Sequence, residues 1–176
     1  MKKNLFLWQL FGITFTALLG TLFHFLYQWT NLKFFATFSA VNESTWEHMK
    51  ILFIPAFAFA ILQSFFFFDA YPCFWVVKLV GVLIGTFLIP ILFYTLTGCF
   101  GKLPAAINVT IFFVAIIVAF TMEYFLLKHA VCFKDFKAIP IAILTLFFIA
   151  FIIFTFHPPK LPLFLDPVTK GYGIVK

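Results

Sequence analysis

The sequence predicts an all-α integral membrane protein, a bundle of about five transmembrane helices with an ordered, non-helical C-terminal tail. Three observations predict this fold. Of the 176 residues, 64% are hydrophobic and only 10% are charged. Five apolar runs are long enough to cross a bilayer, and the four tryptophans fall near the ends of these runs. A soluble domain of this size needs a partly polar surface, so lipid must be the solvent for this chain.

Each predicted span holds the roughly 20 apolar residues that a helix needs to cross about 30 Å of hydrocarbon. Residues 1–176 are therefore expected to form a single transmembrane domain. The predicted spans cover residues 5–28, 45–68, 74–97, 105–127 and 137–156, and the tail covers residues 157–176. Tryptophan and tyrosine near the span ends are typical of the aromatic belt at membrane interfaces. The lipid bilayer is thus the first expected partner.

Local signals inside the spans predict how the helices begin and pack. The segment Ser44–Glu47 fits a capping box, in which the two side chains each satisfy a backbone amide at a helix start. Pro55 lies inside the second span and leaves the carbonyl of Ile51 without its helical donor. The small-residue motif Gly81–Gly85 in the third span predicts close packing against a neighbouring helix.

Five spans place the two termini on opposite faces of the membrane, here named face B for the N-terminal side and face A for the other. Each face carries six lysines. Lys170 and Lys176 lie far along the tail, where charges influence insertion less, so the positive-inside rule favours a cytoplasmic N-terminus. The tail contains four prolines and several large apolar residues, so we expect it to pack along face A.

Face A gathers most of the polar residues that could bind a ligand, with three of the four histidines and three of the six acidic residues. The candidate binding residues are His24, Asn42, Glu43, Ser44, Glu47, His48, His157 and Asp166. Imidazole and carboxylate groups are ligands that zinc accepts, and His24, Glu47 and His48 are the candidate metal ligands. No two histidines have a metal-binding spacing such as H-x-x-x-H, however, and Glu47 also fits a plain capping role.

Lys78 and Glu123 are the charges that intrude furthest into predicted spans. An unpaired charge near the bilayer centre costs a few kcal/mol, so each residue needs a partner. Both lie about one turn inside face B, on spans joined by a short loop. We therefore expect the two residues to form a buried ion pair, or Glu123 to pair with another face-B lysine. The functional alternative is a proton-relay role for Glu123.

The sequence V-N-E-S-T-W-E-H at residues 41–48 resembles the signature of a family of small bacterial polytopic membrane proteins known only as a domain of unknown function. The tail segment at residues 164–173 resembles the closing motif of the same family, so the resemblance covers most of the chain. It implies a bacterial origin and a location in the cytoplasmic membrane. It implies no catalytic activity.

Three classes of function remain open. The first is the binding or passage of a small polar or ionic species at a pocket near the start of the second span. The second is a membrane-embedded metal-dependent hydrolase, and the third is a non-catalytic partner subunit of a membrane complex. A homo-oligomer is compatible with each class. The net charge of +6 does not indicate nucleic-acid binding, because many lysines lie beside apolar runs and anchor the spans. Substrate and cofactor are not identified by the sequence.

Overall fold

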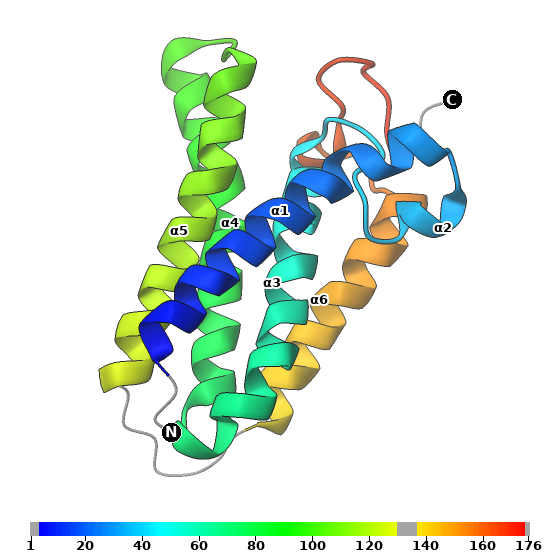
Figure 1. Ribbon diagram of the computed structural model, residues 1–176. Coiled ribbons are helices and arrows are strands. Elements are labelled where there is room, and N and C mark those ends of the chain that lie inside the picture. The colour runs from blue at the N-terminus through cyan, green and yellow to red at the C-terminus, as the bar shows by residue number, and fades with distance from the viewer. Residues whose placement is uncertain (1–3, 130–136, 175–176) are drawn as a thin grey trace.

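The computed structural model describes residues 4–129 and 137–174 (Figure 1). It contains five helices that are long and apolar enough to cross a membrane. They are α1 (Leu5–Thr30), α3 (Thr45–Phe67), α4 (Phe74–Phe100), α5 (Ala105–His129) and α6 (Ala138–Phe156). The short elements are α2 (Lys33–Ala36), η1 (Phe68–Ala70) and η2 (Pro162–Phe164). The described residues form no β-strand, so the predicted all-α membrane bundle is confirmed.

The bounds of the long helices lie within three residues of the predicted spans. The largest difference is at the end of α4, which continues through Gly98 to Phe100. The chain leaves this helix at Gly101, whose φ of 75° is a conformation that glycine adopts without steric cost. The turn between α4 and α5 therefore starts three residues later than the apolar run suggested.

Helix α3 is the central helix of the bundle, because it contacts α1, α4, α5 and α6. Figure 1 shows α1 crossing diagonally over α3, while α4 and α5 form an antiparallel hairpin. Every residue from Thr45 to Ala56 is buried except His48. The first three turns of α3 are thus enclosed by protein, and His48 marks the place where the enclosure opens.

Glycines let α4 and α5 approach closely. A Cβ atom added at Gly85 would lie 2.8 Å from the Cβ atom of Ala119, and one added at Gly81 would collide with the side chain of Glu123. Real Cβ atoms do not come this close, so both positions require glycine as the helices now stand. The predicted close packing of the Gly81–Gly85 motif is confirmed, and its partner is α5.

The ion pair predicted between Lys78 and Glu123 is present, with each residue 1% exposed. The Lys78 ammonium is also surrounded by the rings of Phe59, Phe74 and Phe120, whose centroids lie 5.5, 5.6 and 5.4 Å from Nζ. Aromatic faces attract a cation electrostatically, so they add to the stabilisation that Glu123 provides. The pair joins α4 to α5 inside the bundle.

A second buried ion pair lies at the start of α3. The Lys50 ammonium is 2.6 Å from Glu47 Oε2, and it donates hydrogen bonds to the carbonyl of Ala36 and to Thr155 Oγ1, at 3.0 and 2.8 Å. The Glu47 carboxylate accepts a hydrogen bond from the amide of Val41 at 3.1 Å. The pair therefore links α2, the following loop, α3 and α6 through charged hydrogen bonds between buried side chains.

Only half of the predicted capping box forms. Ser44 Oγ accepts from the Glu47 amide at 3.4 Å, as expected. The Ser44 amide, however, donates to Asn42 Oδ1 at 2.8 Å and not to the Glu47 carboxylate. The reason is electrostatic, because the buried Lys50 ammonium needs Glu47 as its counter-charge.

The tail packs along face A against the start of α3. Phe164 is buried, and its ring centroid lies 4.7 Å from that of Trp46. The side-chain amide of Asn42 donates through Nδ2 to the carbonyl of Gly173 at 2.7 Å, which fastens the far end of the described tail to the loop before α3. The aromatic-belt pattern predicted that Trp46 lies at the membrane interface. The structure instead buries Trp46 under the tail, where it is 7% exposed.

We expect Glu123→Gln to destabilise the protein by about 3–5 kcal/mol, because it leaves the buried Lys78 ammonium without a counter-charge. Replacing both residues, with Lys78→Met and Glu123→Met, should restore most of this stability. Thermal unfolding in detergent measures both effects. A double variant as unstable as the single one would show that the unpaired charge is not the cause.

Substitution of the packed glycine should also lower stability. We expect Gly81→Ala to cost about 1–3 kcal/mol, because the added methyl group must displace Glu123 from its ion pair. Gly98→Ala is a matched control in the same helix, since a Cβ atom there meets nothing within 4 Å. This control should leave the unfolding temperature unchanged or slightly raised. Equal effects at both sites would contradict the packing argument.

Candidate functional site

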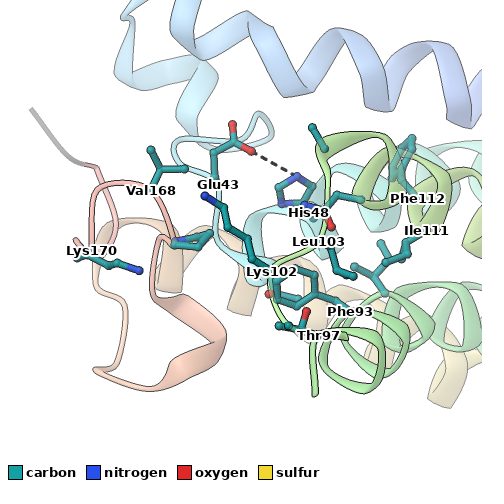
Figure 2. A pocket seen from close by; sticks show the side chains of 16 residues that line it. Glu43, His48, Phe93, Thr97, Lys102, Leu103, Ile111, Phe112, Val168 and Lys170 are labelled. Atoms are coloured by element: carbon teal, nitrogen blue, oxygen red, sulfur yellow. Dashed lines mark ion pairs between the residues drawn. The ribbon is translucent and has the colours of Figure 1, made fainter. Parts of the chain in front are cut away.

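A pocket of about 820 Å³ lies at face A between the α4–α5 hairpin, the start of α3 and the tail (Figure 2). Its apolar wall includes Ile89, Phe93 and Phe112, and its polar side includes Glu43 and His48. A second cavity of about 370 Å³ shares Glu43, His48 and Phe112 with the first and extends between α1 and α5. The two cavities therefore meet at the polar residues that open α3.

Three possible metal ligands converge where the cavities meet, namely His24, Glu43 and His48, here named the His–Glu–His cluster. His24 Nε2 lies 3.7 Å from Glu43 Oε1, and His48 Nε2 lies 3.7 Å from Glu43 Oε2. One ligand atom from each residue falls within 4.8 Å of the other two. Figure 2 shows Glu43 and His48 pointing toward one another. The side chains are 22 to 37% exposed, so the cluster is partly buried and remains open to the pocket.

A backbone contact sets the orientation of the His48 ring. His48 Nδ1 lies 2.9 Å from the carbonyl oxygen of Ser44, one turn earlier. A carbonyl only accepts hydrogen bonds, so Nδ1 must carry the proton in this contact. In the neutral ring the lone pair then belongs to Nε2, the atom that faces Glu43. Metal-binding histidines are held in the same manner by a hydrogen bond from their second nitrogen.

The loop that carries Glu43 is fixed on both sides. The Tyr27 amide of α1 donates to Ser39 Oγ at 2.8 Å, which holds the loop against the helix that carries His24. Asn42, directly before Glu43, is tied to the carbonyl of Gly173 in the tail. Glu43 is therefore presented to both histidines by a backbone that its neighbours immobilise.

The other residues predicted for this site have different places. Glu47, a predicted metal ligand, does not join His24 and His48, because its carboxylate is paired with Lys50. Glu43 is the carboxylate that lies beside the two histidines. Asp166 accepts hydrogen bonds from Val168 N and Thr169 Oγ1 at 2.8 and 2.7 Å, and so shapes a turn of the tail. His157 is exposed at the end of α6. Asn42 and Ser44 hold the loop and the helix start and are not part of the cluster.

Several pocket residues were not singled out from the sequence. Asn108 borders both cavities, and its Oδ1 atom is buried without a hydrogen-bond partner among the described residues. Thr97 lines the larger cavity, and its Oγ1 atom is also buried without a hydrogen-bond partner among the described residues. Lys102 and Lys170 line the larger cavity from the α4–α5 loop and from the tail. For Asn108 the signal was available, since it is a polar residue at the face-A start of a span.

The cluster is wider than a bound zinc ion requires, but its side chains are close enough to converge on one ion. Zinc bonds to imidazole nitrogen and carboxylate oxygen at about 2.0–2.2 Å, so tetrahedral ligand atoms are separated by about 3.3 Å. The histidines lie 3.7 Å from two different oxygens of Glu43, and one ligand atom from each of the three residues lies within 4.8 Å of the other two. The ligands would therefore have to move closer together by up to about 1.5 Å to hold the ion. Two histidines and one carboxylate form a ligand set that leaves a fourth position open in zinc enzymes.

Comparison with known proteins adds a family and no activity. No curated protein and no solved structure matches this chain. The family match spans the described helices, the His–Glu–His cluster and the tail. Because the model of DUF6512, a family of unknown function, matches residues 1–174, the chain belongs to that family.

Proposed function

We propose that this membrane protein binds a divalent transition-metal ion, of the zinc class, in the face-A pocket. The ligands are His24, Glu43 and His48. The observation that carries the proposal is the convergence of three ligand atoms within 4.8 Å, from α1, the loop before α3 and α3 itself. Two neutral imidazoles and one carboxylate would leave a divalent ion with one net positive charge, which an anionic ligand or hydroxide can balance.

The geometry supports binding in a pocket that ends inside the bundle over passage through the membrane. A route across the bilayer needs polar groups that continue from one face to the other. Below the pocket, the described core between α3, α4 and α5 is largely apolar, with buried residues such as Leu52, Ala115 and Ile116. The buried polar residues Gln63 of α3 and Thr86 of α4 are exceptions, and neither is charged. The next charged groups are Lys78 and Glu123, which neutralise each other near face B.

A pocket that ends inside the bundle, with three ligands and an open coordination position, favours metal-dependent hydrolysis as a second candidate function. Metal hydrolases use three protein ligands and keep the fourth position for water or substrate. Hydrolysis of a chromogenic ester by the zinc-loaded protein, abolished in His48→Ala and retained in His157→Ala, would support this candidate.

The partner-subunit alternative receives less support. It calls for a stripe of small residues left free for another membrane protein. The Gly81–Gly85 motif is instead used inside the chain, against Glu123 and Ala119 of α5. Gly12 and Gly20 of α1 are likewise covered, by the rings of Phe120 and Phe112.

We also propose that the protein lies in the bacterial cytoplasmic membrane with a cytoplasmic N-terminus. Lys50 and Lys78, one from each face, are buried in ion pairs and so do not influence the lysine count at the surfaces. The balance still depends on Lys170 and Lys176 in the tail. Reporter fusions at the two ends of the chain test the orientation, and activity of a periplasmic reporter at the N-terminus would contradict it.

Purified full-length protein should bind one equivalent of Zn²⁺ per chain after loading and removal of excess metal. His24→Ala, His48→Ala and Glu43→Gln should each weaken this binding by at least about 10-fold, because each removes one of three ligands. Elemental analysis combined with a competing chelator measures the effect.

His157→Ala and Glu47→Gln separate the cluster from its neighbours. The exposed His157 lies on the same face, so its removal controls for histidines that bind metal nonspecifically. Glu47→Gln removes a carboxylate that the sequence made a candidate ligand, and we expect lower stability with retained zinc stoichiometry. Full zinc binding in Glu43→Gln, or its loss in His157→Ala, would contradict the proposed site.

A further inference from the structure

We propose that the face-A pocket takes a lipid with a terminal phosphate, whose headgroup lies beside the His–Glu–His cluster, Lys102 and Lys170. Its acyl chain would occupy the smaller cavity between α1 and α5. The inference deepens the proposed function, since it names the ligand that shares the pocket with the metal ion. It depends on three features of the pocket: its charge, its sideways opening and its floor.

The charge of the pocket suits an anion. Two lysines and one acidic residue, Glu43, line the larger cavity, and a bound divalent ion would add to the positive side. Neither Lys102 nor Lys170 forms an ion pair with another described residue. Figure 2 shows Lys102 extending into the pocket from the α4–α5 loop, with Lys170 on the tail side. Lysine binds phosphate as a point charge, so two unpaired ammonium groups indicate an anionic headgroup.

The tail places Lys170 at the pocket by a defined turn. Lys170 has a positive φ of 58°, and its amide donates to the carbonyl of Asp166 at 3.0 Å. A left-handed conformation costs a residue with a side chain about 1–2 kcal/mol, and it is kept here by the turn that Asp166 organises. Lys170 is therefore held at the pocket rim by local structure and does not simply trail from the end of the chain.

The smaller cavity opens toward hydrocarbon. Its outer lining includes Phe25 of α1 and Val109 and Phe113 of α5, which are 39, 55 and 40% exposed. Exposed apolar residues in spanning helices face acyl chains. A water-soluble anion could enter through the face-A end of the larger cavity alone. An opening between two spanning helices also admits a ligand that resides in the bilayer.

The crossing of α1 and α5 gives this cavity a floor. A Cβ atom added at Gly20 would lie 2.5 Å from the ring of Phe112 and 2.7 Å from the carbonyl oxygen of Ile51. Pro55 lacks the amide that would bond this carbonyl, so the helix backbone presents it to α1. The contact closes the groove below the cluster. A lipid that enters between the helices therefore cannot move deeper, and its headgroup lies level with His24, Glu43 and His48.

The experiment measures binding of dioctanoyl phosphatidic acid to the purified, zinc-loaded full chain in detergent. Inorganic phosphate, dioctanoyl phosphatidylcholine and dioctanoylglycerol serve as comparison ligands. We expect phosphatidic acid to bind at least about 10-fold more tightly than any of them, because only it combines a terminal phosphate with acyl chains. Equal affinity for inorganic phosphate would show that the pocket takes a soluble anion, and would overturn the inference.

Two sets of variants test the two ends of the ligand. Lys102→Ala with Lys170→Ala should weaken phosphatidic acid binding by about 10-fold or more, while the exposed pair Lys33→Ala with Lys160→Ala should not. Val109→Trp should fill the opening between the helices, weakening the lipid and leaving inorganic phosphate unaffected. Val114→Trp is its control, because Val114 is 38% exposed on the same helix and lines neither cavity. An affinity for phosphatidic acid that is unchanged both in the double lysine variant and in Val109→Trp would overturn the inference.

Zinc content, measured on the same samples, separates this inference from the proposed function. Protein that holds zinc and shows no preference for phosphatidic acid keeps the metal site and refutes the lipid. Protein that holds no zinc and binds phosphatidic acid through Lys102 and Lys170 refutes the metal site and keeps the lipid. The lysine and Val109 variants should retain the zinc stoichiometry of the wild type, since none of them supplies a ligand.

Discussion

Neutralisation of charge inside an apolar bundle is the constraint on which the structure depends. Two lysines are buried among the spanning helices, and each has its own carboxylate, Glu47 for Lys50 and Glu123 for Lys78. A buried charge without a partner costs several kcal/mol, so these carboxylates are committed to the fold. Asp166 is committed to a turn of the tail. On the described part of face A, Glu43 is the acidic residue that remains for a ligand.

One short segment serves both the fold and the pocket. Asn42, Ser44 and Glu47 point into the protein, where they bind the tail, the helix start and Lys50. Glu43 and His48 alternate with them and border the cavities. The contacts of the buried residues hold the backbone on either side of Glu43, and the hydrogen bond of His48 Nδ1 with the Ser44 carbonyl orients the His48 ring. Rigid support of this kind is what a metal site requires.

The apolar runs were sufficient to predict the five helices, because crossing a bilayer leaves a strong length and composition signal. The ion pair of Lys78 and Glu123 was also predictable, since a short loop brings two intruding charges to the same depth. The choice between Glu43 and Glu47 was not. Both acids lie within five residues of His48 in the sequence, and it is the buried Lys50 ammonium that pairs with Glu47 and leaves Glu43 at the pocket. The lining lysines were missed because their approach depends on tertiary structure, the path of the α4–α5 loop for Lys102 and that of the tail for Lys170.

The depth of the pocket connects its two proposed ligands. Its polar residues lie near the face-A ends of the spanning helices α1, α3 and α5, and its apolar wall continues along α4 and α5. A histidine or lysine is easily tolerated at such a depth, whereas the bilayer centre excludes it. Neither Lys102 nor Lys170 is paired in the described structure, and the His–Glu–His cluster links α1 to α3 in a region where their backbones already pack. These groups exceed what the fold needs, and the ligand that uses all of them must be anionic at one end and apolar at the other.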